Sequence, residues 1–127
     1  MQILSTLFID DISMRETSNS LTRIDLTGVQ FTTSVSDDFP LVIAPHLVVL
    51  IHSEAGGTGS GVLEVTYQLN DVEIARNVQP LQIQPSQFAY RLIRAELELN
   101  EPCTVYANCR IDTGNTITIP YTVEASA

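Results

Sequence analysis

Hydrophobic and polar residues alternate with a period of two near the end of the chain. Apolar side chains alternate with Thr, Pro and Thr, and they stand at Ile117, Ile119, Tyr121 and Val123. This spacing is typical of a strand with one face on a core and the other in solvent. Because proline has no N–H to give to a neighbouring strand, Pro120 predicts a sheet edge or a bulge there.

The same alternation recurs along the chain and predicts a series of short strands. Segment 47–53 is nearly all apolar, as in a central strand covered on both sides, and Phe31 is expected to point inward. The expected strands cover residues 3–9, 21–26, 29–35, 47–53, 63–69, 72 onward, 88–99, 103–111 and 116–123.

Many short strands separated by turn residues predict an all-β fold. The favoured architecture is an immunoglobulin-like antiparallel β-sandwich of about 7–9 strands, with a jelly roll or an open barrel as the alternative. The chain has no Trp, which excludes the Cys…Trp…Cys pattern of a true immunoglobulin domain. Its 127 residues suit a single β-sandwich domain over 1–127.

Residues 88–99 carry two apolar faces. The apolar residues of 88–92 share one parity and those of 93–99 share the other. This shift predicts a bulge or a break near Leu92–Ile93. A helix over 89–99 is the alternative, since several residues there are good helix formers, but the alternating end of the segment favours a strand.

Turn residues separate the expected strands. Residues 18–20 and Gly28 indicate turns, and Asn70-Asp71 predicts a tight hairpin. Residues 112–115 should join the last two strands. The Pro- and Gln-rich segment 79–86 is expected to cross between sheets. The residue types of the loops at 10–20, 36–40 and 54–61 favour no particular ligand.

The chain is acidic, with a formal net charge of −9, six arginines and no lysine. Nucleic acids and anionic membranes need a basic patch, and the arginines are scattered along the sequence, so neither partner is expected. No apolar stretch approaches the ~20 residues of a membrane span. Residues 1–11 lack the basic start of a signal peptide. A cytoplasmic location is therefore expected.

Cys103 and Cys109 are the only cysteines. On one extended strand their Cα atoms lie ~20 Å apart, whereas a disulfide needs less than ~7 Å. Both share the parity of the apolar set in their segment. They are expected to be free thiols in the core, which agrees with a reducing compartment.

Two kinds of ligand site are considered for this sequence, a phosphate-binding loop and a metal site. Residues 56–61, Gly-Gly-Thr-Gly-Ser-Gly, resemble a phosphate-binding loop, but such a loop needs a following helix and usually a lysine. We interpret the run as a loop joining two strands. Asp10-Asp11 and Asp37-Asp38 lack the spacing of a calcium loop. His46 and His52 lie ~20 Å apart on an extended strand, so they cannot share one metal.

No catalytic constellation stands out. Gly59-Ser60-Gly61 does not form the Gly-x-Ser-x-Gly pattern of a nucleophile elbow. Glu96 and Glu98 project from one strand face and Glu101 lies in the next turn, so solvation explains them. The expectation is a protein that is not an enzyme, with no catalytic, cofactor-binding or metal-ligating residues and no cofactor.

Several short motifs are similar to those of a family of short, uncharacterised bacterial proteins. In that family an acidic pair ends the first strand, a glycine-containing segment follows, and Phe-Pro precedes a hydrophobic strand. The matching residues here are Phe8–Asp11, Leu21–Gly28, Asp38–Pro40 and Leu47–Ile51. Leu99–Tyr106 resembles a late Leu…Glu-Pro-Gly-x-Tyr step, with Cys103 in place of the glycine. The resemblance implies a β-sandwich and carries no known activity.

These observations favour a non-enzymatic interaction module that binds a protein partner or itself as a homo-oligomer. The outward residues of 117–123 are the expected contact, so Thr118→Lys should weaken it. The alternatives are a structural subunit of a phage-like or shell assembly and, less favoured, a small-ligand or metal-dependent enzyme.

Overall fold

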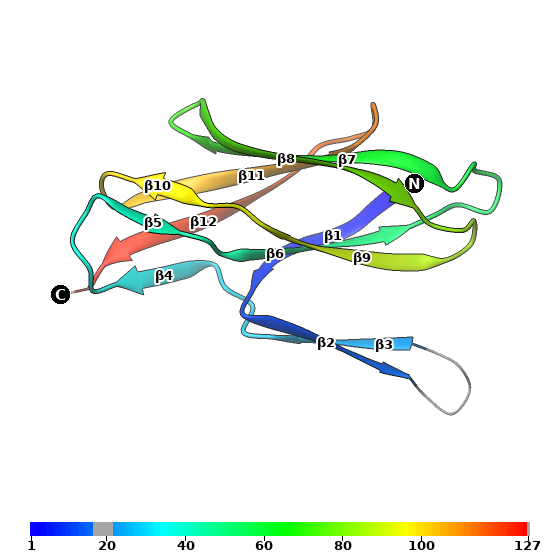
Figure 1. Ribbon diagram of the computed structural model, residues 1–127, viewed down its shortest axis with the longest axis horizontal. Helices are drawn as coiled ribbons and strands as arrows, with labels where there is room; N and C mark the ends of the chain where they lie inside the picture. The colour runs from blue at the N-terminus through cyan, green and yellow to red at the C-terminus, as the bar shows by residue number, and fades with distance from the viewer. Residues whose placement is uncertain (17–21, 127) are drawn as a thin grey trace.

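The computed structural model describes residues 1–16 and 22–126, which contain twelve strands and no helix (Figure 1). The all-β prediction is confirmed, with more strands than the expected seven to nine. The expected turn at 18–20 and Leu21 lie outside the described residues. The strands are β1 (Gln2–Ile9), β2 (Asp11–Glu16), β3 (Thr22–Thr27), β4 (Thr32–Val35), β5 (Leu41–Ile43), β6 (His46–His52), β7 (Ser60–Leu69), β8 (Val72–Gln82), β9 (Phe88–Arg94), β10 (Leu97–Leu99), β11 (Cys103–Ile111) and β12 (Ile117–Ala125).

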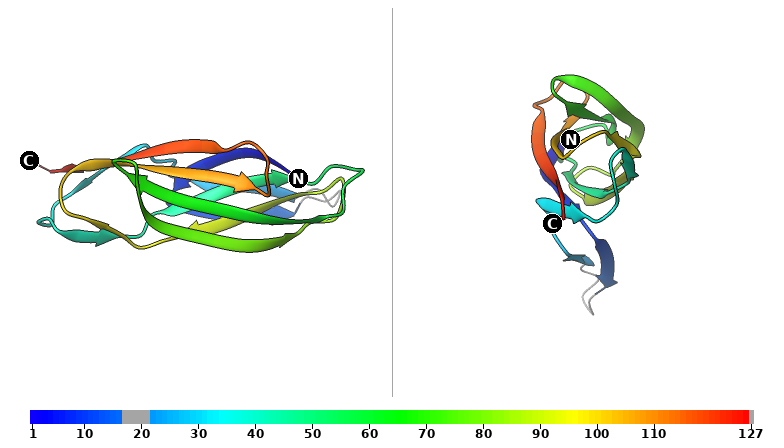
Figure 2. Two further views of the ribbon diagram at one scale, coloured as in Figure 1. Left: turned by 90° about the horizontal axis from the view of Figure 1, so that it is seen from above. Right: turned by 90° about the vertical axis from the view of Figure 1, so that its left-hand side faces the viewer.

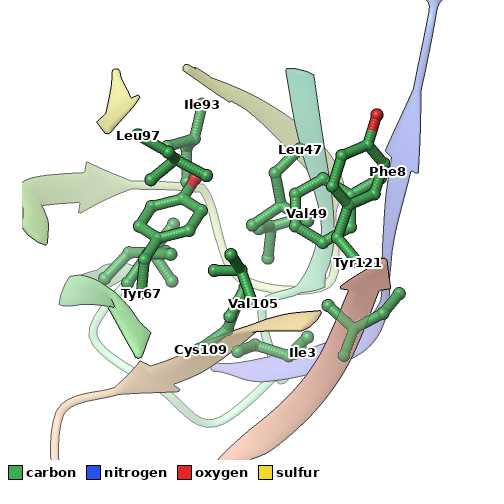
Figure 3. Packing of buried hydrophobic residues seen from close by; sticks show 14 of the residues in the cluster. Ile3, Phe8, Leu47, Val49, Tyr67, Ile93, Leu97, Val105, Cys109 and Tyr121 are labelled. Atoms are coloured by element: carbon green, nitrogen blue, oxygen red, sulfur yellow. The ribbon is translucent and has the colours of Figure 1, made fainter. Parts of the chain in front are cut away.

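Two sheets share one hydrophobic core. The larger has the order β4-β12-β11-β7-β8 and the smaller has the order β1-β6-β9. Neighbouring strands are antiparallel except β4 and β12. Phe8, Leu47 and Val49 from the smaller sheet join Tyr67 and Val105 from the larger one in a single buried cluster (Figure 3). The end-on view in Figure 2 shows the strands arranged around a common interior.

One long antiparallel ladder is interrupted in its middle, which raises the strand number. Ile43 of β5 faces Leu97 of β10, and His46 of β6 faces Arg94 of β9, in one continuous register. The interruption on one side falls at Ala44-Pro45. Proline has no N–H for the ladder, so Pro45 accounts for the break.

The strand preferred for 88–99 is confirmed, but the bulge or break expected near Leu92–Ile93 is wrong. The interruption falls at residues 95–96. Odd-numbered positions face the core both before and after this interruption, since Ile93, Leu97 and Leu99 are all buried. The apolar residues at even-numbered positions of 88–92 therefore form the outer face of β9, and the alternation does not shift there.

The hairpin of β2 and β3 projects away from the rest of the molecule (Figure 2). Its described residues contribute nothing to the main buried cluster. At its base, the Asp10 N–H donates to the carbonyls of Thr27 and Gly28, both at 3.0 Å, and the Gln30 N–H donates to the Phe8 carbonyl at 2.7 Å. Gly28 has a φ of +65°, which fits the turn expected there.

The segment 29–35 differs from its prediction. Only Thr32–Val35 form a strand, and Phe31 is 63% exposed, so the inward placement of Phe31 is wrong. Parallel pairing with β12 starts at Thr32. The Phe31 carbonyl accepts a hydrogen bond from the Thr122 N–H at 3.0 Å, which fixes the backbone while the side chain remains in solvent.

Other expectations hold with adjusted limits. Strand β4 pairs with Thr122–Ala125, so among the described residues β12 has one neighbour at Pro120, as the proline predicts. Asn70 and Asp71 have φ values of 52° and 65°, as in a tight hairpin turn. The connection predicted over 79–86 is shorter, because β8 continues to Gln82, and it does cross between the two sheets.

Candidate functional site

The glycine-rich loop connects two strands, as expected. It runs from β6 to β7, and Ser60 already belongs to β7. The Gly57 N–H donates to the Glu54 carbonyl at 3.1 Å, which closes a turn. A strand follows this loop in place of the helix that a phosphate site requires.

The aspartate pairs and the histidines do not assemble into one metal site. Within residues 1–16 and 22–126, no group of three His, Cys, Asp or Glu side chains is placed to hold a metal ion. His46 and His52 occupy the two ends of β6. The His52 ring packs against Phe88 with centroids 4.5 Å apart, and His46 Nδ1 lies 3.2 Å from the Asp10 carbonyl oxygen.

A polar cluster occupies the base of the hairpin. It lines a cavity of ≈310 Å³ that includes Asp10, Gln30, His46 and Tyr121. The Tyr121 hydroxyl donates to Gln30 Oε1 at 2.7 Å, and Gln30 Nε2 donates to the Asp10 carboxylate. Burial raises the pKa of the Tyr121 hydroxyl. These polar groups bind one another, and their arrangement orients the hairpin.

The two cysteines are free, as predicted. Cys109 is buried with its Sγ 3.7 Å from Thr6 Oγ1, and Cys103 is half-buried. Burial raises the pKa of both thiols. Because the thiolate is the nucleophilic form, this environment disfavours reactivity at either cysteine.

The outer face of the five-stranded sheet is polar around Thr118. The outward residues of β12 were expected to form an interface, and Thr118 is exposed there. Its hydroxyl donates to Asn108 Oδ1 at 2.6 Å, and Asn108 Nδ2 donates to Gln68 Oε1 at 3.2 Å. These groups already satisfy one another across three strands, so they are poor anchors for a partner.

An apolar groove lies between the projecting hairpin and β9. We call it the β9 groove; its volume is ≈590 Å³. The hairpin contributes Met14 and Ile24, which are cross-strand partners. The remaining lining residues are Phe88, Ala89, Tyr90, Arg91 and Leu92.

Strand β9 is an edge strand, and its free edge borders this groove. Within residues 1–16 and 22–126, its only strand partner is β6, along the whole length from Phe88 to Arg94. Successive residues of a strand point to opposite faces, yet all of the residues 88–92 line the groove. The groove therefore follows the strand edge, where alternate N–H and C=O groups have no sheet partner.

The apolar lining is largely open to solvent. Phe88 is 70% exposed, Met14 54% and Leu92 42%. Contiguous exposed apolar surface on a folded domain is typical of an interaction site. The groove therefore has the composition and the shape of a docking surface.

Strand β9 carries two arginines, of which Arg91 lines the groove and Arg94 lies beyond it. Arg91 donates from Nη1 to the Tyr90 carbonyl at 2.9 Å, and Arg94 donates from Nε to the Ala44 carbonyl at 3.3 Å. Neither forms an ion pair with a carboxylate in the part of the chain that the structure describes. Strand β9 has no acidic residue of its own, so this edge is locally basic.

Sequence reasoning did not find the β9 groove. A signal for it was present in the sequence, because the apolar residues at even-numbered positions of 88–92 form part of the groove wall. The residues of the other wall lie more than sixty positions earlier in the chain.

No protein-family model matches this chain, and no curated protein is significantly similar to it. Among the described residues, no helix is long and apolar enough to cross a membrane. Functional proposals for this protein therefore start from its geometry.

Proposed function

We propose that this protein is a non-enzymatic, immunoglobulin-like β-sandwich that binds a protein partner through the β9 groove. The observation that carries the proposal is the groove itself, which joins exposed apolar side chains to a free strand edge. Side chains supply apolar area and the edge supplies backbone hydrogen bonds, the two features used in binding by strand addition.

The energetics favour a bound partner. Burying a Phe, Leu or Met side chain stabilises a complex by ~1.5–3 kcal/mol when it starts fully exposed. Phe88, Leu92 and Met14 are each only partly buried in the free chain. A partner that covers all three gains several such increments, in part offset by the cost of association.

Affinity capture from native lysate, measured by quantitative mass spectrometry, tests this function. Wild type is compared with Leu92→Asp, which places a charge in the groove, and with Val78→Asp on the edge strand β8. Val78 is a matched control because it is 53% exposed, against 42% for Leu92, and lies outside the groove. Loss of an interface anchor costs ~2 kcal/mol or more, about a thirtyfold weaker complex.

We expect a partner that is recovered with wild type and Val78→Asp and lost with Leu92→Asp, while circular dichroism shows all three folded. Equal recovery of every bound protein by the three chains would place the interface elsewhere. Thr118→Lys is a further arm, because its selective loss of binding would favour the outer face of β12 instead.

A further inference from the structure

Charge distinguishes the groove from the rest of the molecule. The strands β2, β3 and β9 carry four of the six arginines and three acidic residues. The remainder of the chain carries two arginines and twelve acidic residues. The groove thus lies on the least acidic part of a strongly acidic protein.

Strand alternation places these arginines differently. Met14 and Ile24 line the groove, so their neighbours Arg15 and Arg23, which are also cross-strand partners, belong to the opposite face of the hairpin. Arg91 lines the groove itself, and Arg94 follows in the same strand. The charge that an occupant meets directly is therefore that of Arg91.

We propose that the occupant of the β9 groove is an extended segment of another protein, with apolar and acidic residues in alternation, that adds to β9 as a strand. This assignment holds only if the groove is the binding surface proposed above. Each free N–H and C=O of β9 would gain a backbone partner. Apolar side chains of the segment would pack between the hairpin and β9, and a carboxylate of the segment would pair with Arg91, which lines the groove.

A second copy of this chain fits the edge less well. If two β9 strands paired antiparallel about a two-fold axis, Arg91 and Arg94 of both copies would gather on one short ladder without an acidic residue. Like charges opposite each other destabilise a sheet. An acidic segment avoids this repulsion and neutralises Arg91.

The Arg91 side chain also limits unspecific pairing at the free edge of β9. Its hydrogen bond to the Tyr90 carbonyl occupies a backbone acceptor beside the groove. Charged side chains on edge strands limit unspecific pairing. An arriving carboxylate can draw the guanidinium away from that carbonyl and free it for a strand N–H, so an acidic segment both binds and opens the edge.

Selection of displayed random peptides on the immobilised protein, with counter-selection on Leu92→Asp, tests this occupant. We expect enriched peptides to carry apolar residues at every second position and an excess of Asp and Glu. Synthesised winners, followed by fluorescence anisotropy, should bind wild type and Val78→Asp alike. They should bind Arg91→Ala about tenfold more weakly, with a smaller difference at high salt.

Amide hydrogen exchange gives a readout that a flat contact would not give. With a winning peptide bound, alternate amides of 88–94 should exchange more slowly, because only every second residue points its N–H to the free edge. The five-stranded sheet should show no such alternation.

Several outcomes would overturn the acidic-strand assignment while leaving the groove as the binding surface. These are enriched peptides that are basic or have apolar residues at helical spacing, unchanged exchange in β9, or no groove-dependent peptide despite a lysate partner that is lost with Leu92→Asp. Sedimentation that shows a dimer abolished by Leu92→Asp would make a second copy the occupant. Failure of the lysate capture to depend on Leu92 would reject the binding surface itself.

Discussion

Two buried tyrosines differ in how their hydroxyl groups are satisfied. Tyr67 is fully buried in the core (Figure 3), and its hydroxyl has no hydrogen-bond partner among the described residues. Tyr121 is also buried, but its hydroxyl donates to Gln30. A buried hydroxyl without a partner costs ~1–3 kcal/mol, whereas a satisfied one contributes about 1 kcal/mol.

Tyr67→Phe should therefore stabilise the protein. We expect the free energy of unfolding to rise by about 1 kcal/mol and Tm by about 3 °C, measured by urea and thermal denaturation. Tyr121→Phe is the matched control and should lower the free energy of unfolding by about 1 kcal/mol. A loss of stability in Tyr67→Phe would show that its hydroxyl is satisfied in solution.

The same substitution should change stability in alkali. Burial is the main cause that raises the pKa of Tyr67 above its usual value, so the folded state holds the phenolic proton more tightly than the unfolded state. The free energy of unfolding is therefore unaffected by this titration below pH ~10, and it falls as pH rises above that value, where the unfolded state loses the proton first. Tyr67→Phe should lose less stability than wild type between pH 10 and 11, as urea titrations at each pH would show.

At the scale of elements, the junction of β1 with the β2–β3 hairpin depends on a single glycine. Gly28 has a φ of +65°, and a Cβ there would overlap the Asp10 carboxylate. That carboxylate accepts from Gln30, which also accepts from Tyr121. The direction of the hairpin, and with it one wall of the groove, follows from this contact.

Gly28→Ala should loosen the hairpin more than the core. We expect a cost of ~1–3 kcal/mol, with faster amide exchange in β2 and β3 than in β6 or β7. Gly56→Ala is the control, because a Cβ at Gly56 meets nothing within 4 Å. Equal effects of the two substitutions would mean that the hairpin base tolerates a side chain.

The strands that the sequence predicts well are those with one solvent-exposed face and one buried face. Segments 63–69, 103–111 and 117–123 alternate cleanly and form β7, β11 and β12. Periodicity reports burial, so it fails where an outer face is apolar for another reason. In residues 88–92 the outward side chains are apolar because they line a groove and not a core, so the sequence indicates a shift in the alternation that the structure does not have.

The candidate site could not be predicted for a second physical reason. Its two walls meet only because the hairpin leaves the sheet at Asp10, Gly28 and Gln30, and those contacts are long-range. The turn at Gly28 was visible in the sequence. The direction in which it sends the hairpin was not, since no local pattern encodes it.

At the scale of the whole molecule, charge and apolar surface are distributed together. The arginines are scattered along the sequence, yet Arg15, Arg23, Arg91 and Arg94 belong to the three strands that border the β9 groove. The rest of the chain, mainly its loops, carries twelve of the fifteen acidic residues. An acidic partner is therefore steered toward the groove and away from other surfaces, an effect that salt weakens.

The hairpin should serve binding and contribute little to folding. Ser13 and Asp25 are cross-strand partners, so an Asn-Gly turn can replace residues 14–24 and remove the wall formed by Met14 and Ile24. Because no described residue of this segment belongs to the main core, we expect Tm to change by no more than about 2 °C and partner capture to fall as in Leu92→Asp. An Asn-Gly turn in place of 16–22 is the control; it keeps that wall and should keep binding. Equal loss in both variants would assign binding to residues 16–22 and not to the β9 groove.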